Sequence, residues 1–154
     1  MKSMVCENEI WDFLRTITEG MANAFRPIVE EHGLTLMQTR ILVEIKKECS
    51  QTVGSLGGIV GLSSGNASSM CKKLEVAGFI KRIRTPEDER YVKLAITEFG
   101  AETIKKIEDA LEKKYGAFLE SKGEDEFRNF ITSMEIVSSF IREMSEFKSD
   151  KITE

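Results

Sequence analysis

Residues 78–100 read GFIKRIRTPEDERYVKLAITEFG, and this stretch decides the fold. Two β-rich runs, Ile80 to Arg84 and Tyr91 to Ile96, flank a turn-forming segment with Pro86, and this pattern predicts a β-hairpin. The hairpin carries three acidic side chains and five basic ones, which are Lys81, Arg82, Arg84, Arg90 and Lys93. A protruding cationic ribbon of this kind is suited to contact with a polyanion.

The Ser-rich segment directly before the hairpin predicts a helix with one buried and one polar face. Between Ser63 and Ala77 the apolar residues follow the i, i+3, i+4, i+7 spacing of a buried helix face, at Ala67, Met70, Cys71 and Leu74. The other side and its flanks are small and polar, and we assign seven residues there to DNA contact: Ser63, Ser64, Asn66, Ser68, Ser69, Lys72 and Lys73. Their hydroxyl, amide and ammonium groups suit phosphates and base edges in a major groove.

A short, glycine-rich helix is predicted upstream of this one. Residues 53–60 have apolar side chains at helical spacing, a turn follows, and Ser63 is the expected N-cap of the next helix. Helix, short turn and helix in this order indicate a helix-turn-helix. Each interior glycine costs a helix about 1 kcal/mol relative to alanine, so we expect tertiary packing by Leu56, Ile59 and Leu62 to hold the short helix together.

An ordered set of residues runs through and around these elements: Leu34, Thr35, Gln38, Leu56, Leu62, Ser63, Ser68, Leu74, Gly78, Asp88, Arg90, Ile96, Thr97 and Gly100. By this set the chain resembles the MarR family of bacterial and archaeal winged-helix transcription regulators. The resemblance implies a mainly α fold with a small β-wing, a winged helix-turn-helix plus N- and C-terminal dimerisation helices. It also implies that Asp88 and Arg90 act as a pair at the wing tip, with the arginine entering the minor groove. Glu89 departs from the family pattern, which has a further arginine at that place.

Long apolar stripes on both sides of the DNA-reading segment predict dimerisation helices. One stripe lies on a helix from about Glu7 to Glu31, and two more follow residue 100. They exceed what a small wing domain can cover, so we favour a homodimer over an intramolecular core alone. The predicted regions are a helical dimerisation region of residues 1–33 and 101–147, a winged helix-turn-helix DNA-binding domain of residues 34–100 and a disordered tail of residues 148–154.

Charge is distributed unevenly along the 154 residues, whose formal net charge is −4. Residues 51–100 carry seven basic and five acidic side chains, a balance of +2, whereas residues 101–154 carry nine and thirteen, a balance of −4. Positive charge therefore gathers where DNA contact is expected, and the acidic remainder limits non-specific binding. No apolar run reaches ~18 residues and no apolar signal segment opens the chain, so we expect a cytoplasmic protein without membrane contact.

The residues give little support to an enzyme or a metal site, and we predict no catalytic residue, no metal ligand and no cofactor. The one histidine, His32, adjoins an expected helix end at Gly33, where a capping role is favoured. The three cysteines form no C-x-x-C pair. Cys71 is expected in the core and Cys49 at a helix end, while Cys6 is expected just before the N-terminal helix. Some members of the resembled family carry an oxidant-sensing thiol at that last place.

These expectations combine into a homodimeric repressor that binds double-stranded DNA at an inverted-repeat operator. The resemblance implies that a small aromatic or phenolic effector changes its affinity for DNA. Trp11 and Phe25 are conceivable residues of an effector pocket, although core packing is favoured for both. Two alternatives remain: a winged-helix module that binds another protein, and a thiol-based oxidant-sensing regulator of the same family.

Overall fold

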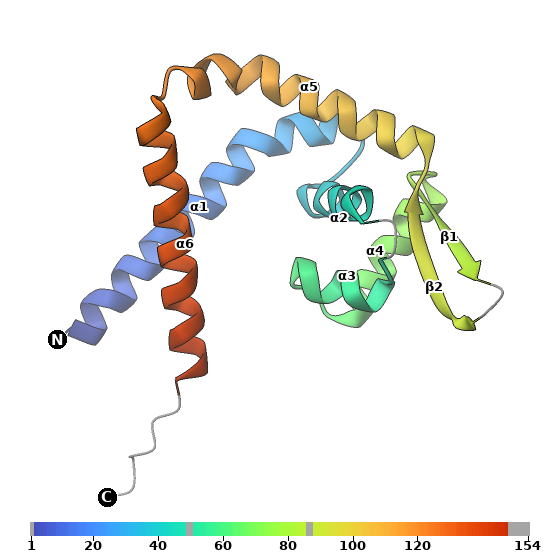
Figure 1. Ribbon diagram of the computed structural model, residues 1–154, viewed down its shortest axis with the longest axis horizontal. Coiled ribbons are helices and arrows are strands. Elements are labelled where there is room, and N and C mark those ends of the chain that lie inside the picture. Colours follow the sequence, from blue (N-terminus) through green and yellow to red (C-terminus); the bar gives the residue numbers. More distant parts are fainter. Residues whose placement is uncertain (1, 49–50, 86–87, 148–154) are drawn as a thin grey trace, which may run out of the picture. The chain divides into compact units, whose positions relative to one another are not determined.

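The computed structural model describes residues 2–48, 51–85 and 88–147, and the side chains of residues 7–48, 51–83 and 92–147 (Figure 1). In chain order its elements are α1 (Lys2–Glu31), α2 (Leu36–Lys47), α3 (Val53–Val60), α4 (Ser64–Val76), β1 (Ile80–Thr85), β2 (Asp88–Ile96), α5 (Glu98–Glu120) and α6 (Glu124–Glu146). The mainly α fold with a small antiparallel β-wing is confirmed. The chain divides into two compact units, residues 1–112 and 113–154, with the division inside α5.

Helix α1 begins earlier than the sequence indicated. It starts at Lys2 rather than near Glu7 and runs through Pro27 to Glu31. Cys6 therefore lies within the helix, and its expected place before the helix was wrong. The residues ahead of the apolar stripe have adequate helix propensity, and the helix continues through them.

The core of the first unit lies among the end of α1, α2, α3, α4, the roots of the wing strands and the start of α5. Its largest fully buried side chains include Leu34, Ile41, Leu42, Ile45, Leu56, Leu74, Ile80, Leu94 and Ile104. Helix α2 enters this core through a capping box: the Thr35 Oγ1 accepts a hydrogen bond from the Gln38 backbone amide at 3.2 Å, and the Thr35 backbone amide donates to the Gln38 side chain at 2.8 Å. This reciprocal pair satisfies two backbone donors that the helix start leaves free.

Helix α3 is held together only partly as predicted. Leu56 is fully buried, but Ile59 is 47% exposed, so its expected packing role was wrong. The missing stabilisation comes from a second capping box, in which Thr52 and Ser55 exchange side-chain bonds with each other's backbone amides. Gly57 also has a steric reason, because a Cβ there would lie 3.1 Å from the Leu62 carbonyl oxygen and 3.3 Å from the side chain of Ala67 on α4. The two helices of the motif thus pack closely at a glycine.

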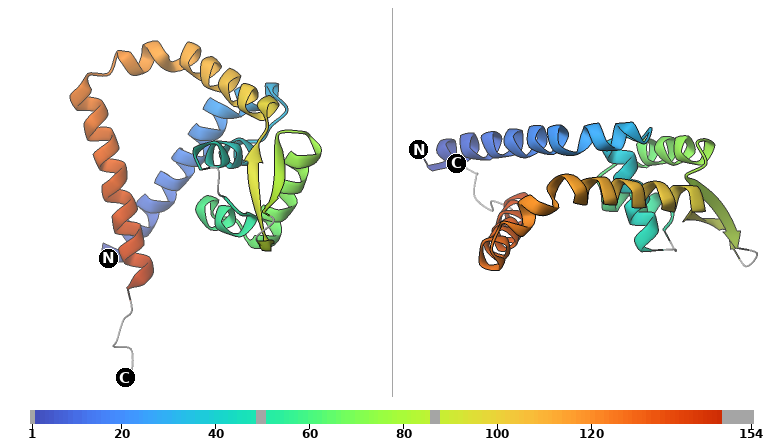
Figure 2. Two further views of the ribbon diagram at one scale, coloured as in Figure 1. Left: turned by 45° about the vertical axis from the view of Figure 1, so that its right-hand side comes forward. Right: turned by 90° about the horizontal axis from the view of Figure 1, so that it is seen from above.

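The wing strands β1 and β2 project as a ribbon from the end of α4 (Figure 2). Ile80 pairs with Ile96 and Arg84 with Val92 in antiparallel register. Gly78 turns the chain from α4 into β1 with a φ of 81°, which favours glycine. At the same root, the Thr97 hydroxyl donates to the Gly78 carbonyl at 2.6 Å and accepts from the Gly100 amide at 3.0 Å. One threonine therefore fixes both the base of the wing and the start of α5.

The second unit contains the end of α5 and all of α6. No residue of α6, Glu124–Glu146, is buried. Three acidic residues occupy its first turn, where the positive end of the helix dipole stabilises their negative charge. Its apolar side chains are consequently left at the surface of the single chain.

Candidate nucleic-acid interface

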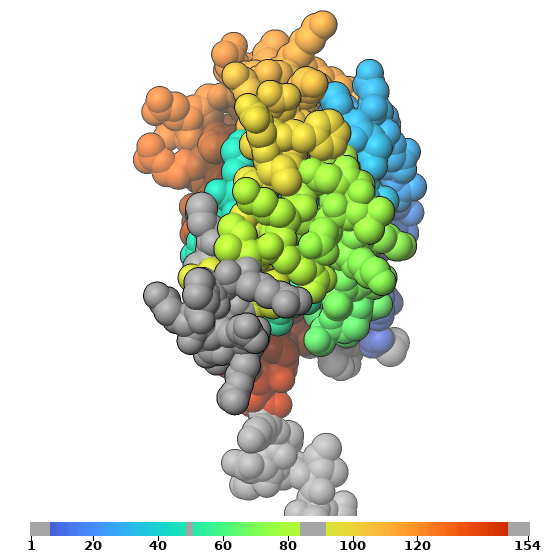
Figure 3. All heavy atoms as spheres, turned by 90° about the vertical axis from the view of Figure 1, so that its right-hand side faces the viewer, coloured from blue at the N-terminus to red at the C-terminus, as the bar shows by residue number. Residues whose placement is uncertain are grey.

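Helix α4 has the two faces that the sequence predicted. Ala67, Cys71 and Leu74 are fully buried against the rest of the lobe. All seven residues assigned to DNA contact are exposed: Ser63, Ser64, Asn66, Ser68, Ser69, Lys72 and Lys73. Figure 3 looks onto the side where α4 and the described part of the wing lie next to each other. The structure thus brings the seven residues together on one exposed helix, whereas their contact with DNA stays a prediction.

Ser63 fixes where α4 begins. Its side-chain oxygen accepts a hydrogen bond from the Asn66 amide at 3.5 Å, as expected of an N-cap. The preceding Gly61 has a φ of 70° and ends α3 in the left-handed conformation. This short turn sets the start of α4 at the outer surface, where its exposed serines follow directly.

For the three predicted DNA-contact residues of the wing, the structure shows only the strand on which each lies. Arg84 lies on β1, and Asp88 and Arg90 lie on β2, but their side chains are outside the described residues. Their role at a wing tip therefore stays a prediction. Of the other cations on the ribbon, Lys81 is exposed and Lys93 is half-buried.

A contact at the wing root was not predicted from the sequence. The Arg82 Nε donates to the Glu75 Oε2 at 3.0 Å and joins β1 to the last turn of α4. The partners lie seven positions apart in the chain and on two different elements, a helix and a strand, so no spacing rule within one element marks them as a pair.

A second unpredicted contact joins the wing to the start of α3. The Leu94 amide donates to the Gln51 carbonyl oxygen at 2.8 Å, and Thr52 forms an isolated antiparallel bridge with Lys93. Gln51, the residue before the N-cap of α3, is thus hydrogen-bonded to strand β2. This pairing ties the helix-turn-helix to the ribbon independently of α4.

The cysteines differ in what the structure shows of them. Cys71 is fully buried, and desolvation raises the pKa of its thiol above the ordinary value of 9.0, with a smaller lowering by the Arg82 charge. The core role expected for it is confirmed, and its thiolate is disfavoured. Cys49 and the side chain of Cys6 lie outside the described residues.

Other classes of site find no support in the part of the chain that the structure describes. No group of three or more His, Cys, Asp or Glu side chains there could hold a metal ion. No described helix is long and apolar enough to cross a membrane.

Trp11 is 65% exposed, so the core packing favoured for it was wrong for the single chain.

Comparisons with known proteins agree with this architecture. The family model for the transcriptional regulators SarA/Rot matches residues 23–107. The HTH-type transcriptional regulator SarZ of Staphylococcus haemolyticus is 28% identical over 90% of this chain and 93% of its own length. The organic hydroperoxide resistance transcriptional regulator of Bacillus subtilis is 32% identical over 64% of this chain and 67% of its own length.

Solved structures share the fold at lower sequence identity. Reduced AbfR bound to DNA matches with a TM-score of 0.77 at 21% identity and covers 95% of this chain and 99% of its own. Staphylococcus aureus MarR in complex with salicylate and kanamycin also matches with a TM-score of 0.77 at 21% identity, over 95% of this chain and 97% of its own.

The helix-turn-helix, the β-wing and these likenesses define a winged-helix transcriptional regulator. The expected resemblance to MarR-type regulators is confirmed by the fold. Within that class, the chain belongs to the SarA/Rot family of transcriptional regulators.

Proposed function

We propose that this regulator works as a homodimer that binds an inverted-repeat operator in double-stranded DNA. The observation that carries the proposal is the outer face of α4, where seven small polar or basic side chains are exposed beside a cationic wing in an otherwise acidic chain. Side chains of this kind can enter a major groove closely and bond to phosphates and base edges. The DNA complex of the structurally similar AbfR supports the same use of the fold.

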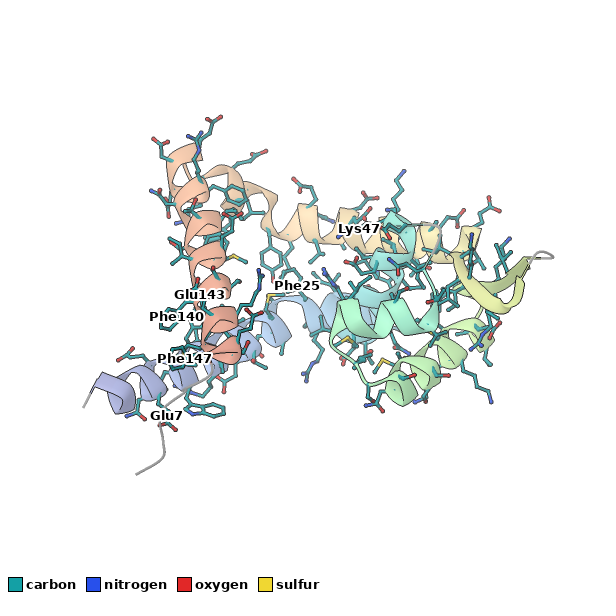
Figure 4. All side chains as sticks on the ribbon, turned by 60° about the horizontal axis from the view of Figure 1, so that its bottom comes forward. Glu7, Phe25, Lys47, Phe140, Glu143 and Phe147 are labelled. Atoms are coloured by element: carbon teal, nitrogen blue, oxygen red, sulfur yellow. The ribbon has the colours of Figure 1, made fainter. Side chains whose placement is uncertain are left out.

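The unburied apolar faces of α1 and α6 support self-association. On α1, Leu14, Ile17 and Met21 are each about half exposed, at 47%, 47% and 50%. Phe140 on α6 and Phe147, the capping residue directly after α6, project from the same side of the helix axis, with exposures of 50% and 78% (Figure 4). A helix with such faces needs a partner surface, because isolated soluble chains rarely expose large apolar patches. A second copy supplies that surface and also places two α4 helices about a two-fold axis.

The proposed outcome is repression, with release from DNA controlled by a small aromatic effector. The salicylate complex of the similar S. aureus MarR supports an effector of this chemistry. Such a ligand acts only if it binds the DNA-bound and DNA-free conformations with different affinity. Titration of salicylate into the protein–operator complex tests this part: a lower operator affinity is expected, and an unchanged affinity excludes salicylate as effector.

Thiol-based oxidant sensing is a second candidate for the control step. It is supported by the 32% identity to a hydroperoxide resistance regulator. Cys71 is a poor sensor because its buried thiol has a raised pKa, so the proposal assigns the role to Cys6 on α1. Replacement of Cys6 by serine is expected to abolish any reduction of DNA binding caused by organic hydroperoxide, and an unchanged response excludes Cys6.

Arg90→Ala separates the DNA-binding proposal from a protein-interaction module. If Arg90 contacts DNA, the variant binds the operator more weakly, and its salt dependence is shallower by about 0.9 for each phosphate that it no longer neutralises. The dimer remains intact, since the strand is remote in sequence from the apolar stripes. Unchanged affinity and salt slope would exclude this residue from the interface and favour the protein-interaction module. We also propose that the protein acts as a regulator without catalytic activity.

A further inference from the structure

The junction between the recognition helix and the wing contains a partly exposed ion pair on the side of the ribbon that faces α4. Arg82 follows the buried Ile80 by two residues and lies opposite the buried Leu94, so its side chain leaves β1 on the inner face of the ribbon. There its Nε meets the Glu75 carboxylate at 3.0 Å. The two side chains are 34% and 36% exposed, which places the pair at the edge of the core.

The surroundings show that this pair joins two elements that would both approach DNA. Glu75 stands four residues after the buried Cys71, on the flank of α4 that faces β1. Gly78 is the sharp turn between the partners, and its amide donates to the Glu75 carbonyl oxygen at 3.0 Å. The turn and the ion pair therefore close the same short loop, one through the backbone and one through side chains.

The charge of Glu75 makes its location informative. A carboxylate beside a DNA-binding surface repels phosphates, so electrostatics alone favours its absence. A partly exposed ion pair also adds little stability, about 0–1 kcal/mol. Neither DNA attraction nor folding stability therefore explains an acid at this place.

We infer that Glu75 and Arg82 are positioning residues that set the angle between α4 and the wing, so that both elements fit one operator half-site at the same time. The inference rests on the proposed DNA-binding function and adds a specificity role to it. Arg82 suits the task because its planar guanidinium holds a fixed direction, which a lysine ammonium does not. Neither residue needs to touch a base for the pair to affect sequence preference.

The test uses Glu75→Gln in the full-length protein. Two probes are compared: the duplex that the wild-type protein enriches from a random pool, and a scrambled duplex of the same length. Because a partly exposed pair adds little stability, we expect the variant to fold, and its thermal melting is measured alongside. Glu102→Gln, which removes an exposed acid from α5, is the matched control for the removal of one negative charge.

The positioning role predicts different effects on the two probes. Glu75→Gln should weaken binding to the enriched duplex between about twofold and 30-fold, the range found for residues that act through others. Binding to the scrambled duplex should be unchanged or tighter, because a negative charge has been removed. Equal or tighter binding to both probes, or an equal weakening of both, would overturn the inference.

A charge-conserving variant keeps the test decisive if Glu75→Gln does not fold. Arg82→Lys retains the cation and removes the Nε donor, so it should lower the preference for the enriched duplex while the salt slope stays the same. An unchanged preference would overturn the positioning role. A different result, in which the wild-type protein enriches no duplex, would overturn the proposed function itself and this inference with it.

Discussion

Replacement of Lys72 by alanine tests the proposed DNA surface quantitatively. Lys72 is exposed on the outer side of α4, and alanine is the best helix former, so the fold should be retained. The proposed dimer presents two copies of this lysine. If each neutralises one phosphate, the slope of log K against log salt becomes shallower by about 1.8 in the variant.

This slope has a directly measurable consequence. Between 50 and 200 mM salt, a slope difference of about 1.8 means that the affinity of the wild-type protein falls about 12-fold further than that of the variant. Fluorescence anisotropy with a labelled operator duplex at several salt concentrations measures it. Lys113→Ala, on an exposed part of α5 outside the first unit, is the matched control and should leave the slope unchanged. An unaltered slope for Lys72→Ala, or an equal change for both variants, would refute the assignment of α4 to the phosphate backbone.

Three further predictions concern stability and assembly. Gly100→Ala should lower the free energy of unfolding by about 1–3 kcal/mol in urea titrations, because the new Cβ would overlap the Phe79 carbonyl oxygen. Gly20→Ala, in open space on α1, is the control and should raise the free energy of unfolding by about 1 kcal/mol. Equal effects would contradict the close approach. Burial raises the pKa of the Cys71 thiol, so its protonated form stabilises the fold below the ordinary value of 9.0 and this part is lost as pH rises further. Denaturation of Cys71→Ala at several alkaline pH values should show a weaker decline than that of the wild type, and parallel curves would exclude this linkage. Met134→Asp places a carboxylate on the apolar stripe of α6, where Met134 is 49% exposed in the single chain. In the dimer this charge would be buried without a partner, which costs several kcal/mol, so the dimer should be at least about 100-fold weaker in sedimentation experiments. An unchanged dimer would show that the dimer interface lies elsewhere.

The sequence predicts local features of this fold well where one residue type has one physical role. Thr35 with Gln38 is a capping box, Ser63 is an N-cap, and the two faces of α4 follow from helical spacing. Thr97 likewise stands at the start of α5, where its hydroxyl accepts from the Gly100 amide. Each of these depends on neighbours within a few residues, which a single sequence displays directly.

Features that depend on distant partners could not be predicted in the same way. Helical spacing marks Ile59 as a core-facing residue without showing which surface would cover it, and Ile59 is exposed in the single chain. Trp11, for which core packing was favoured, is exposed as well. The pairing of Glu75 with Arg82 depends on the angle at which the chain leaves α4, which no local pattern encodes. The capping box of Thr52 and Ser55 is local but was not predicted, because its third helical residue is a serine rather than the usual Glu or Gln.

Selection of bound duplexes from a random DNA pool tests the central claim most directly, with the affinity of the enriched duplex followed against salt. The account predicts an inverted repeat whose half-site centres lie about 10 base pairs apart, or a multiple of the helical turn, together with a steep fall in affinity as salt rises. Absence of any enriched sequence, with weak binding that ignores sequence, would contradict operator recognition and favour a winged helix that binds another protein.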